Sequence, residues 1–118
     1  MAYIAVQGCI LETSPGTGVV TVTSVPATDV FVDNKGCYFG QLAFAVSAYS
    51  NPTTGIMQGA GAGAIPGTGI HCQNSGQNAV LEGDKVTLVV TGVRGNRTAT
   101  ESVTVTVKSA NQTSTDVT

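Results

Sequence analysis

The clearest hydrophobic pattern lies in residues 101–108, where valine alternates with serine and threonine. Val103, Val105 and Val107 share one face of this segment, and small polar side chains occupy most of the other. A period of two residues is typical of an antiparallel strand that buries one face and solvates the other. The preceding residues 94–97 are rich in turn-forming types. We therefore predict a strand that follows a tight turn.

Shorter apolar segments earlier in the chain are separated by glycine, proline, asparagine and aspartate. Short strands between frequent turns indicate an all-β domain, and the abundant valine and threonine favour a sheet. Residues 42–49 fit either a strand or a helical turn, because so short an apolar run has no decisive periodicity. The other predicted strands are residues 3–11, 19–25, 30–32 and 79–90, the last as a hairpin that turns at Gly83 and Asp84.

Residues 53–69 form a distinct segment that is rich in glycine, alanine, threonine and proline and contains no charged residue. We predict a packed loop here, because a solvated linker is normally richer in polar side chains. The alternative is a flexible low-complexity segment. A phosphate-binding loop is not indicated, since the segment lacks the Gly-Lys-Ser/Thr ending of such loops.

Size and charge narrow the range of functions. A chain of 118 residues makes one domain, and a charged content of only 10% implies a surface that meets a partner. The net charge of −2 and the five scattered basic residues argue against a nucleic-acid partner. No apolar run approaches the roughly 20 residues that cross a bilayer, so stable membrane insertion is not expected. No secretory signal is visible, which favours synthesis in the cytoplasm.

The chain contains four soft metal-ligand candidates, which are Cys9, Cys37, His71 and Cys72. Three thiolates and one imidazole make a complete tetrahedral set for one structural metal ion, zinc or alternatively iron. Because neighbours in a regular strand point to opposite sides, His71 and Cys72 can both ligate only from an irregular segment. Two alternatives stay open, namely buried thiols that only pack and a single disulfide.

A catalytic function has little support in the sequence. His71 is the only histidine, so it would have to act as the general base for Cys9 or Cys37. An orienting carboxylate would then come from one of three aspartates, Asp29, Asp33 or Asp84. No motif around these residues matches a known nucleophile elbow. We therefore expect no enzyme activity.

Several short motifs together resemble one known family. They are Val6-Gln7-Gly8-Cys9, Pro15-Gly16-Thr17, the turn at residues 33–36, the glycine- and proline-rich middle with its cysteine, and Val80-Leu81-Glu82-Gly83-Asp84. In this combination the chain resembles the PAAR-like proteins of contractile injection systems. The resemblance covers about residues 3–93.

The resemblance implies a small, pointed all-β domain that caps the trimeric β-helical spike of a type VI secretion system or a phage-tail-like particle. Such a tip sharpens the spike for transient membrane puncture, sometimes carries an effector, and is pinned at its apex by one metal ion. The family domain would occupy residues 1–93, a C-terminal strand extension residues 94–108, and a flexible tail residues 109–118. The protein would be made in the bacterial cytoplasm without a signal peptide and ejected toward a target cell.

Two other functions stay open as alternatives. One is a decoration protein of a phage or virion, and the other is an extracellular β-sandwich binding module. The Thr-Val strands suit a sandwich, and two glycosylation sequons, Asn96-Arg97-Thr98 and Asn111-Gln112-Thr113, fit a secreted protein. Tripeptides of this kind also arise by chance in a threonine-rich chain.

Overall fold

The structure is a computed structural model that describes residues 3–32 and 34–112, and for His71 it describes the backbone only. All regular structure in these residues is β, which confirms the predicted all-β class. The ten strands are β1 (Ile10–Ser14), β2 (Thr17–Val22), β3 (Phe31–Val32), β4 (Lys35–Gly36), β5 (Gln41–Asn51), β6 (Ile56–Pro66), β7 (Gly69–Asn74), β8 (Gln77–Ala79), β9 (Lys85–Arg94) and β10 (Arg97–Ser109). No helix among the described residues is long and apolar enough to cross a membrane.

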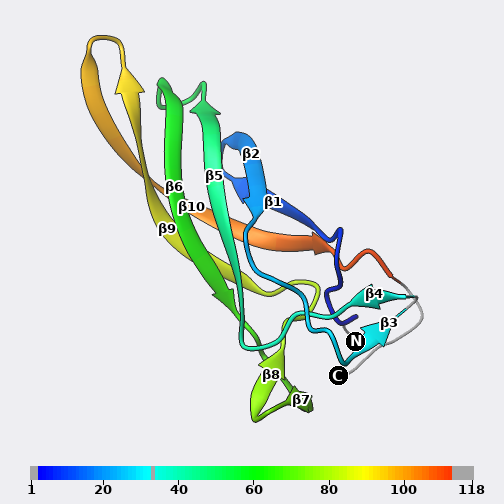
Figure 1. The fold of residues 1–118 in the computed structure, drawn as a ribbon. Helices are drawn as coiled ribbons and strands as arrows, with labels where there is room; N and C mark the ends of the chain where they lie inside the picture. The colour runs from blue at the N-terminus through cyan, green and yellow to red at the C-terminus, as the bar shows by residue number, and fades with distance from the viewer. Residues whose placement is uncertain (1–2, 33, 113–118) are drawn as a thin grey trace.

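Six strands form one antiparallel sheet in the order β1-β10-β9-β6-β5-β2. The sheet curls until its two edge strands, β1 and β2, come together, so that it makes a nearly closed barrel (Figure 1). The pairs β3–β4 and β7–β8 form two small sheets at one end of this barrel. The molecule is elongated, with principal extents of 48 × 22 × 22 Å.

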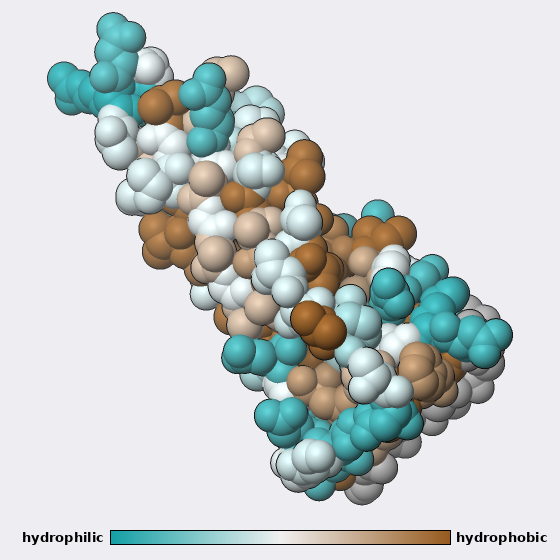
Figure 2. All heavy atoms as spheres, in the orientation of Figure 1, coloured by the Kyte–Doolittle hydropathy of each residue, from teal (hydrophilic) through white to brown (hydrophobic). Residues whose placement is uncertain are grey.

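The two ends of the molecule differ in breadth and in polarity (Figure 2). We call the end that carries the two small sheets the base, which comprises residues 3–9, 25–40 and 67–83. We call the opposite end the tip, which comprises the turns at residues 52–55 and 94–97. The tip is narrow and hydrophilic, whereas the base is broad and also exposes apolar side chains.

The strands of the barrel are longer than the short strands that the sequence predicted. β5 and β6 have 11 residues each, β9 has 10 and β10 has 13. The ambiguous segment at residues 42–49 is a strand inside β5, where Leu42, Phe44 and Val46 point into the core. Pairing with neighbours on both sides stabilises strands of this length.

The prediction of a loop at residues 53–69 is wrong, because most of this segment is β6 at the centre of the barrel sheet. Strict Gly-Ala alternation places the glycines on the inner face. A Cβ atom at Gly63 would lie 3.2 Å from the Phe44 ring, and one at Gly59 would lie 2.9 Å from Tyr49 Cβ. The strand therefore uses glycine to make room for large side chains of its neighbour β5.

The predicted hairpin at Gly83 and Asp84 is also wrong in its pairing. A turn does occur there, with Gly83 at φ +95°. However, β8 before the turn pairs with β7, and β9 after it pairs with β6 and β10. The turn thus passes the chain from the base into the barrel.

The C-terminal segment is integral to the fold. β10 lies between β1 and β9, and its Val103, Val105 and Val107 are buried, as the alternation predicted. Ala110 and Gln112, in the segment expected to be a flexible tail, are buried against the base, and Gln112 Nε2 donates to the Ile4 carbonyl at 3.0 Å. Residues 113–118 lie outside the described residues.

Candidate functional site

The base is closed by a triangle of three chain segments that are distant in the sequence. They are residues 4–6, 37–39 and 79–81. The central residue of each segment donates its N–H to the carbonyl of another, in a closed cycle: Ala5 to Val80 at 2.7 Å, Val80 to Tyr38 at 3.0 Å, and Tyr38 to Ala5 at 3.1 Å. The cycle satisfies six backbone groups, three N–H and three C=O, without a conventional sheet.

The sides of this triangle repeat the same pattern three times. Each pair of segments makes one antiparallel bridge, and the bridges are Ile4–Leu81, Val6–Cys37 and Phe39–Ala79. One further backbone hydrogen bond extends each side, from Glu82 to Tyr3, from Gln7 to Gly36 and from Gly40 to Asn78. The pattern of backbone hydrogen bonds therefore has pseudo-threefold symmetry, although the three sequences share no repeat.

The two sides of the triangle face different cores. Ala5, Tyr38 and Val80 pack into the barrel core, so they close its lower end. The flanking residues point the other way, into a second cluster in the base with Val30, Val32 and Cys72. The triangle is thus the floor of the barrel and the roof of the base.

The structure divides the predicted metal ligands between these two clusters. Cys37 is buried in the base cluster, and the half-buried Cys72 packs against the same cluster. Cys9 is buried in the barrel core. The side chain of His71 lies outside the described part of the chain. Cys37 and Cys72 therefore fit a shared site. Cys9 does not, because it belongs to the barrel core and the other two belong to the base cluster.

The three thiols are all free, and burial favours the protonated form of Cys9 and Cys37. Burial raises the pKa of Cys9 to about 11. Burial also raises the pKa of Cys37, with a smaller contribution from the charge of Cys72. No group of three or more histidine, cysteine, aspartate or glutamate side chains comes together among those the structure describes. Because the thiolate is the ligand form, metal binding would have to displace these protons, and the metal site stays a prediction.

The aspartates considered as orienting groups have structural contacts instead. Asp29 accepts a hydrogen bond from Asn74 Nδ2 at 3.0 Å. Asp84 joins the base to the barrel: its carboxylate accepts from Leu81 N–H at 2.9 Å and from Thr68 Oγ1 at 2.5 Å, and its carbonyl accepts from Val107 N–H at 2.9 Å. Asp33 lies outside the described residues.

A cluster of polar side chains, which the sequence did not indicate, lies in the barrel near the tip. The Tyr49 hydroxyl is fully buried, accepts from Gly16 N–H at 2.9 Å and donates to Glu101 Oε2 at 2.5 Å. Glu101 also accepts from Thr54 Oγ1 at 2.6 Å and from Asn51 Nδ2 at 3.1 Å. These bonds lower the pKa of Glu101, with the Thr54 bond as the largest cause. Burial raises the pKa of Tyr49, and its bond to Glu101 adds to this shift.

This Tyr49–Glu101 cluster ties together the β1–β2 corner, the β5–β6 turn and β10. Each polar atom in it has a partner, and no buried side-chain nitrogen or oxygen among the described residues lacks one. A saturated network of this kind specifies the packing of the barrel.

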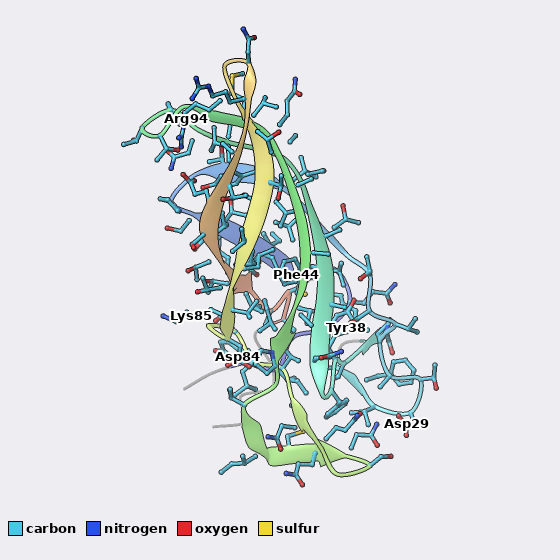
Figure 3. The ribbon with its side chains drawn as sticks, turned by 90° about the vertical axis from the view of Figure 1, so that its left-hand side faces the viewer. Asp29, Tyr38, Phe44, Asp84, Lys85 and Arg94 are labelled. Atoms are coloured by element: carbon cyan, nitrogen blue, oxygen red, sulfur yellow. The ribbon has the colours of Figure 1, made fainter. Side chains whose placement is uncertain are left out.

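Three large apolar side chains are exposed on the outer surface of the base. Val25 is 84% exposed, Phe31 57% and Ile70 64%. A shallow hollow in the base is lined by residues 25–29 together with Phe39, Asn74 and Gln77. Asp29, one of these residues, is labelled in Figure 3. Exposed apolar residues also lie on the barrel, among them Val19 and Met57, so the hollow is what distinguishes the base as a candidate contact surface.

Comparison with protein-family models, curated proteins and solved structures found no match to this chain.

Proposed function

We propose that this protein is a non-catalytic structural tip that caps the trimeric β-helical spike of a bacterial contractile injection system. The pseudo-threefold triangle at residues 4–6, 37–39 and 79–81 is the observation that carries the proposal. A single chain that caps a homotrimer must present three equivalent directions to it, because the axis of the spike relates three identical faces. The triangle supplies a threefold arrangement of backbone within one chain, at the roof of the base that would meet the spike.

The base is the end that would dock on the spike. Val25, Phe31 and Ile70 expose apolar surface there, and burying it against a partner is favourable by about 25 cal/mol per Å². The short strands β3, β4, β7 and β8 also offer backbone edges that a partner sheet can extend. The tip is hydrophilic (Figure 2) and would then point away from the spike toward the target membrane. Its turn between β9 and β10 exposes Arg94 and Arg97.

A structural metal would act in the base and not at the point of the cone. Cys37 and Cys72 would supply thiolates to a zinc or iron ion beside the triangle, and metal–ligand bonds supply folding free energy on the order of 10 kcal/mol in small domains. This differs from an ion that pins an apex, because the narrow tip contains none of the four predicted ligands.

Spike binding is the direct test of this function. Binding to a purified spike trimer from a contractile system of the same genome would be measured by calorimetry for the wild type and for Phe31→Asp and Ile70→Asp. We expect each base variant to weaken binding at least about tenfold, because it buries an unpaired charge. Val89→Asp is the matched control, since Val89 is 60% exposed on the barrel wall. Equal binding by base and control variants would contradict docking through the base.

Absence of any spike binding by the wild type would contradict the proposed function and favour the virion-decoration or extracellular-module alternatives.

Metal content tests the predicted ion separately. Elemental mass spectrometry of protein purified without chelator should find about one zinc or iron per chain, lost in Cys72→Ser and His71→Ala. Cys9→Ser should retain the metal, because Cys9 lies in the other cluster. Wild-type protein without metal would contradict the predicted ion and would favour the alternative in which the cysteines only pack.

A further inference from the structure

The strand β10 has a backbone edge that no described residue pairs with. Val107 N–H donates to the Asp84 carbonyl and the Val107 carbonyl accepts from Gly83, so the backbone groups of Val107 point toward β9. β9 and β10 pair without a bulge from Arg97 to Thr106. Because the direction of these groups alternates along a strand, the odd-numbered residues of β10 bond to β9 and the even-numbered residues point to the opposite edge.

The neighbour on that opposite edge, β1, covers only half of β10. It pairs with residues 104–109 and ends at Ser14, which lies opposite Thr104. The even-numbered residues beyond this point are Thr98, Thr100 and Ser102, and all three are exposed. Their three N–H and three C=O groups therefore form a free edge.

This free edge lacks the features that normally block strand addition. It has no proline and no bulge, and its outward side chains are two threonines and a serine. Two charged residues lie in residues 97–103: Arg97 is exposed at the end beside the turn, and Glu101 points inward, where it is held by Tyr49, Asn51 and Thr54. Natural monomers protect long edges with charge, proline or bulges, so an unprotected edge indicates a pairing partner.

We propose that the partner is a second copy of this chain, added antiparallel along residues 97–103 with Thr100 on the twofold axis. In this register Thr100 faces Thr100 of the other copy and Thr98 faces Ser102. All three pairs are of the hydrogen-bonded type, so they make six backbone hydrogen bonds. In these pairs hydroxyl side chains lie opposite hydroxyl side chains, which can form cross-strand hydrogen bonds.

The pattern of charges and the length of the edge both fit this occupant. Across the twofold axis Arg97 faces Val103 and Glu101 faces Ala99, so no like charges are opposed. The free segment is bounded by the turn after Arg94 on one side and by the end of β1 on the other. An identical segment therefore fills it from end to end, and the twofold contact closes without further growth.

The dimer would join two barrels into one continuous sheet and leave both bases free at opposite ends. It does not rest on the proposed spike function, and it concerns the protein before it docks on a spike, because a second copy lies beside the tip in this dimer.

Sedimentation equilibrium over a concentration series tests the dimer. The wild type should fit a monomer–dimer equilibrium, and Thr100→Pro should weaken dimerisation at least about tenfold, because it removes the central edge N–H but no bond to β9. A proline control at Thr91 is unsuitable, because it would disrupt the barrel. The matched pair of variants is therefore Thr100→Lys, on the free edge, and Thr91→Lys, in the paired strand. Thr91 lies beside Thr100 on the same face but in the paired strand β9. Only Thr100→Lys should weaken the dimer, since it opposes two like charges.

Crosslinking tests the register independently of affinity. Thr100→Cys should form a covalent dimer under mild oxidation, with the wild type as the control for crosslinks through Cys72, because Cα atoms of a hydrogen-bonded pair lie about 5.5 Å apart. Thr91→Cys should form none, since three strand spacings of about 4.8 Å would separate the two thiols. A wild type that stays monomeric, a dimer that Thr100→Pro leaves unchanged, or a Thr91→Cys crosslink would overturn the proposal.

Discussion

The barrel and the base are built in different ways from the same chain. The barrel uses four long strands in one sheet, with an apolar core that includes Phe44, Val90, Val103 and Val105. The base uses strands of two to six residues, and the triangle joins its three segments through isolated bridges and a cycle of backbone bonds. Periodic side-chain burial stabilises the barrel, whereas the base depends on backbone pairing between distant segments.

The largest expected effect is in the barrel core. Phe44→Ala should lower the free energy of unfolding by about 3–5 kcal/mol, because it removes a fully buried ring from a cluster that cannot collapse around it. The measurement is urea denaturation. Val89→Ala, on the exposed outer face, should change stability by less than about 0.5 kcal/mol. A loss below about 1 kcal/mol for Phe44→Ala would mean that the barrel core does not dominate stability.

The next effect concerns the polar cluster inside the barrel. Tyr49→Phe should cost about 1–3 kcal/mol, because it leaves the N–H of Gly16 without an acceptor. Tyr38→Phe is the control, since the Tyr38 ring packs in the same core and its hydroxyl makes no hydrogen bond to a described residue. Equal losses in the two variants would show that the hydroxyl of Tyr49 adds nothing beyond packing.

A smaller effect should separate the base from the barrel. Asp84→Ala removes the carboxylate that accepts from Leu81 and Thr68, so we expect a loss of about 1 kcal/mol. Native-state hydrogen exchange should show faster exchange in the base, with little change in β10. Asp29→Ala, which removes one exposed contact to Asn74, should leave both regions unchanged. Equal changes in barrel and base would mean that the two unfold as one unit.

The smallest effect is on the pH dependence of stability. The lowered pKa of Glu101 means that its carboxylate stabilises the fold above its unfolded pKa, and this contribution is lost as the pH falls through its folded pKa. The melting temperature should therefore fall more steeply with decreasing pH for the wild type than for Glu101→Gln. Glu12→Gln, on the surface of β1, should follow the wild type. Identical acid profiles for Glu101→Gln and the wild type would contradict the role of this carboxylate.

The sequence alone determined the β class, the strand at β10 and the turns at Gly83 and at residues 94–97. These features depend on local alternation and on turn-forming residues, which act over a few positions. The same local reasoning failed for β6, because a Gly-Ala repeat has no hydrophobic signal of its own. Its place in the sheet follows from the large side chains of Tyr49 and Phe44, which need small residues opposite them.

Only the tertiary structure decided the features on which function depends. The triangle joins Ala5, Tyr38 and Val80 through backbone atoms, which are the same in every residue and leave no pattern in the sequence. The separation of Cys9 from Cys37 and Cys72, and the free edge at Thr100, depend on which strands become neighbours. Long-range pairing is set by the packing of the whole chain. The sequence could therefore identify the cysteines as candidate ligands, but it could not show which of them lie close together.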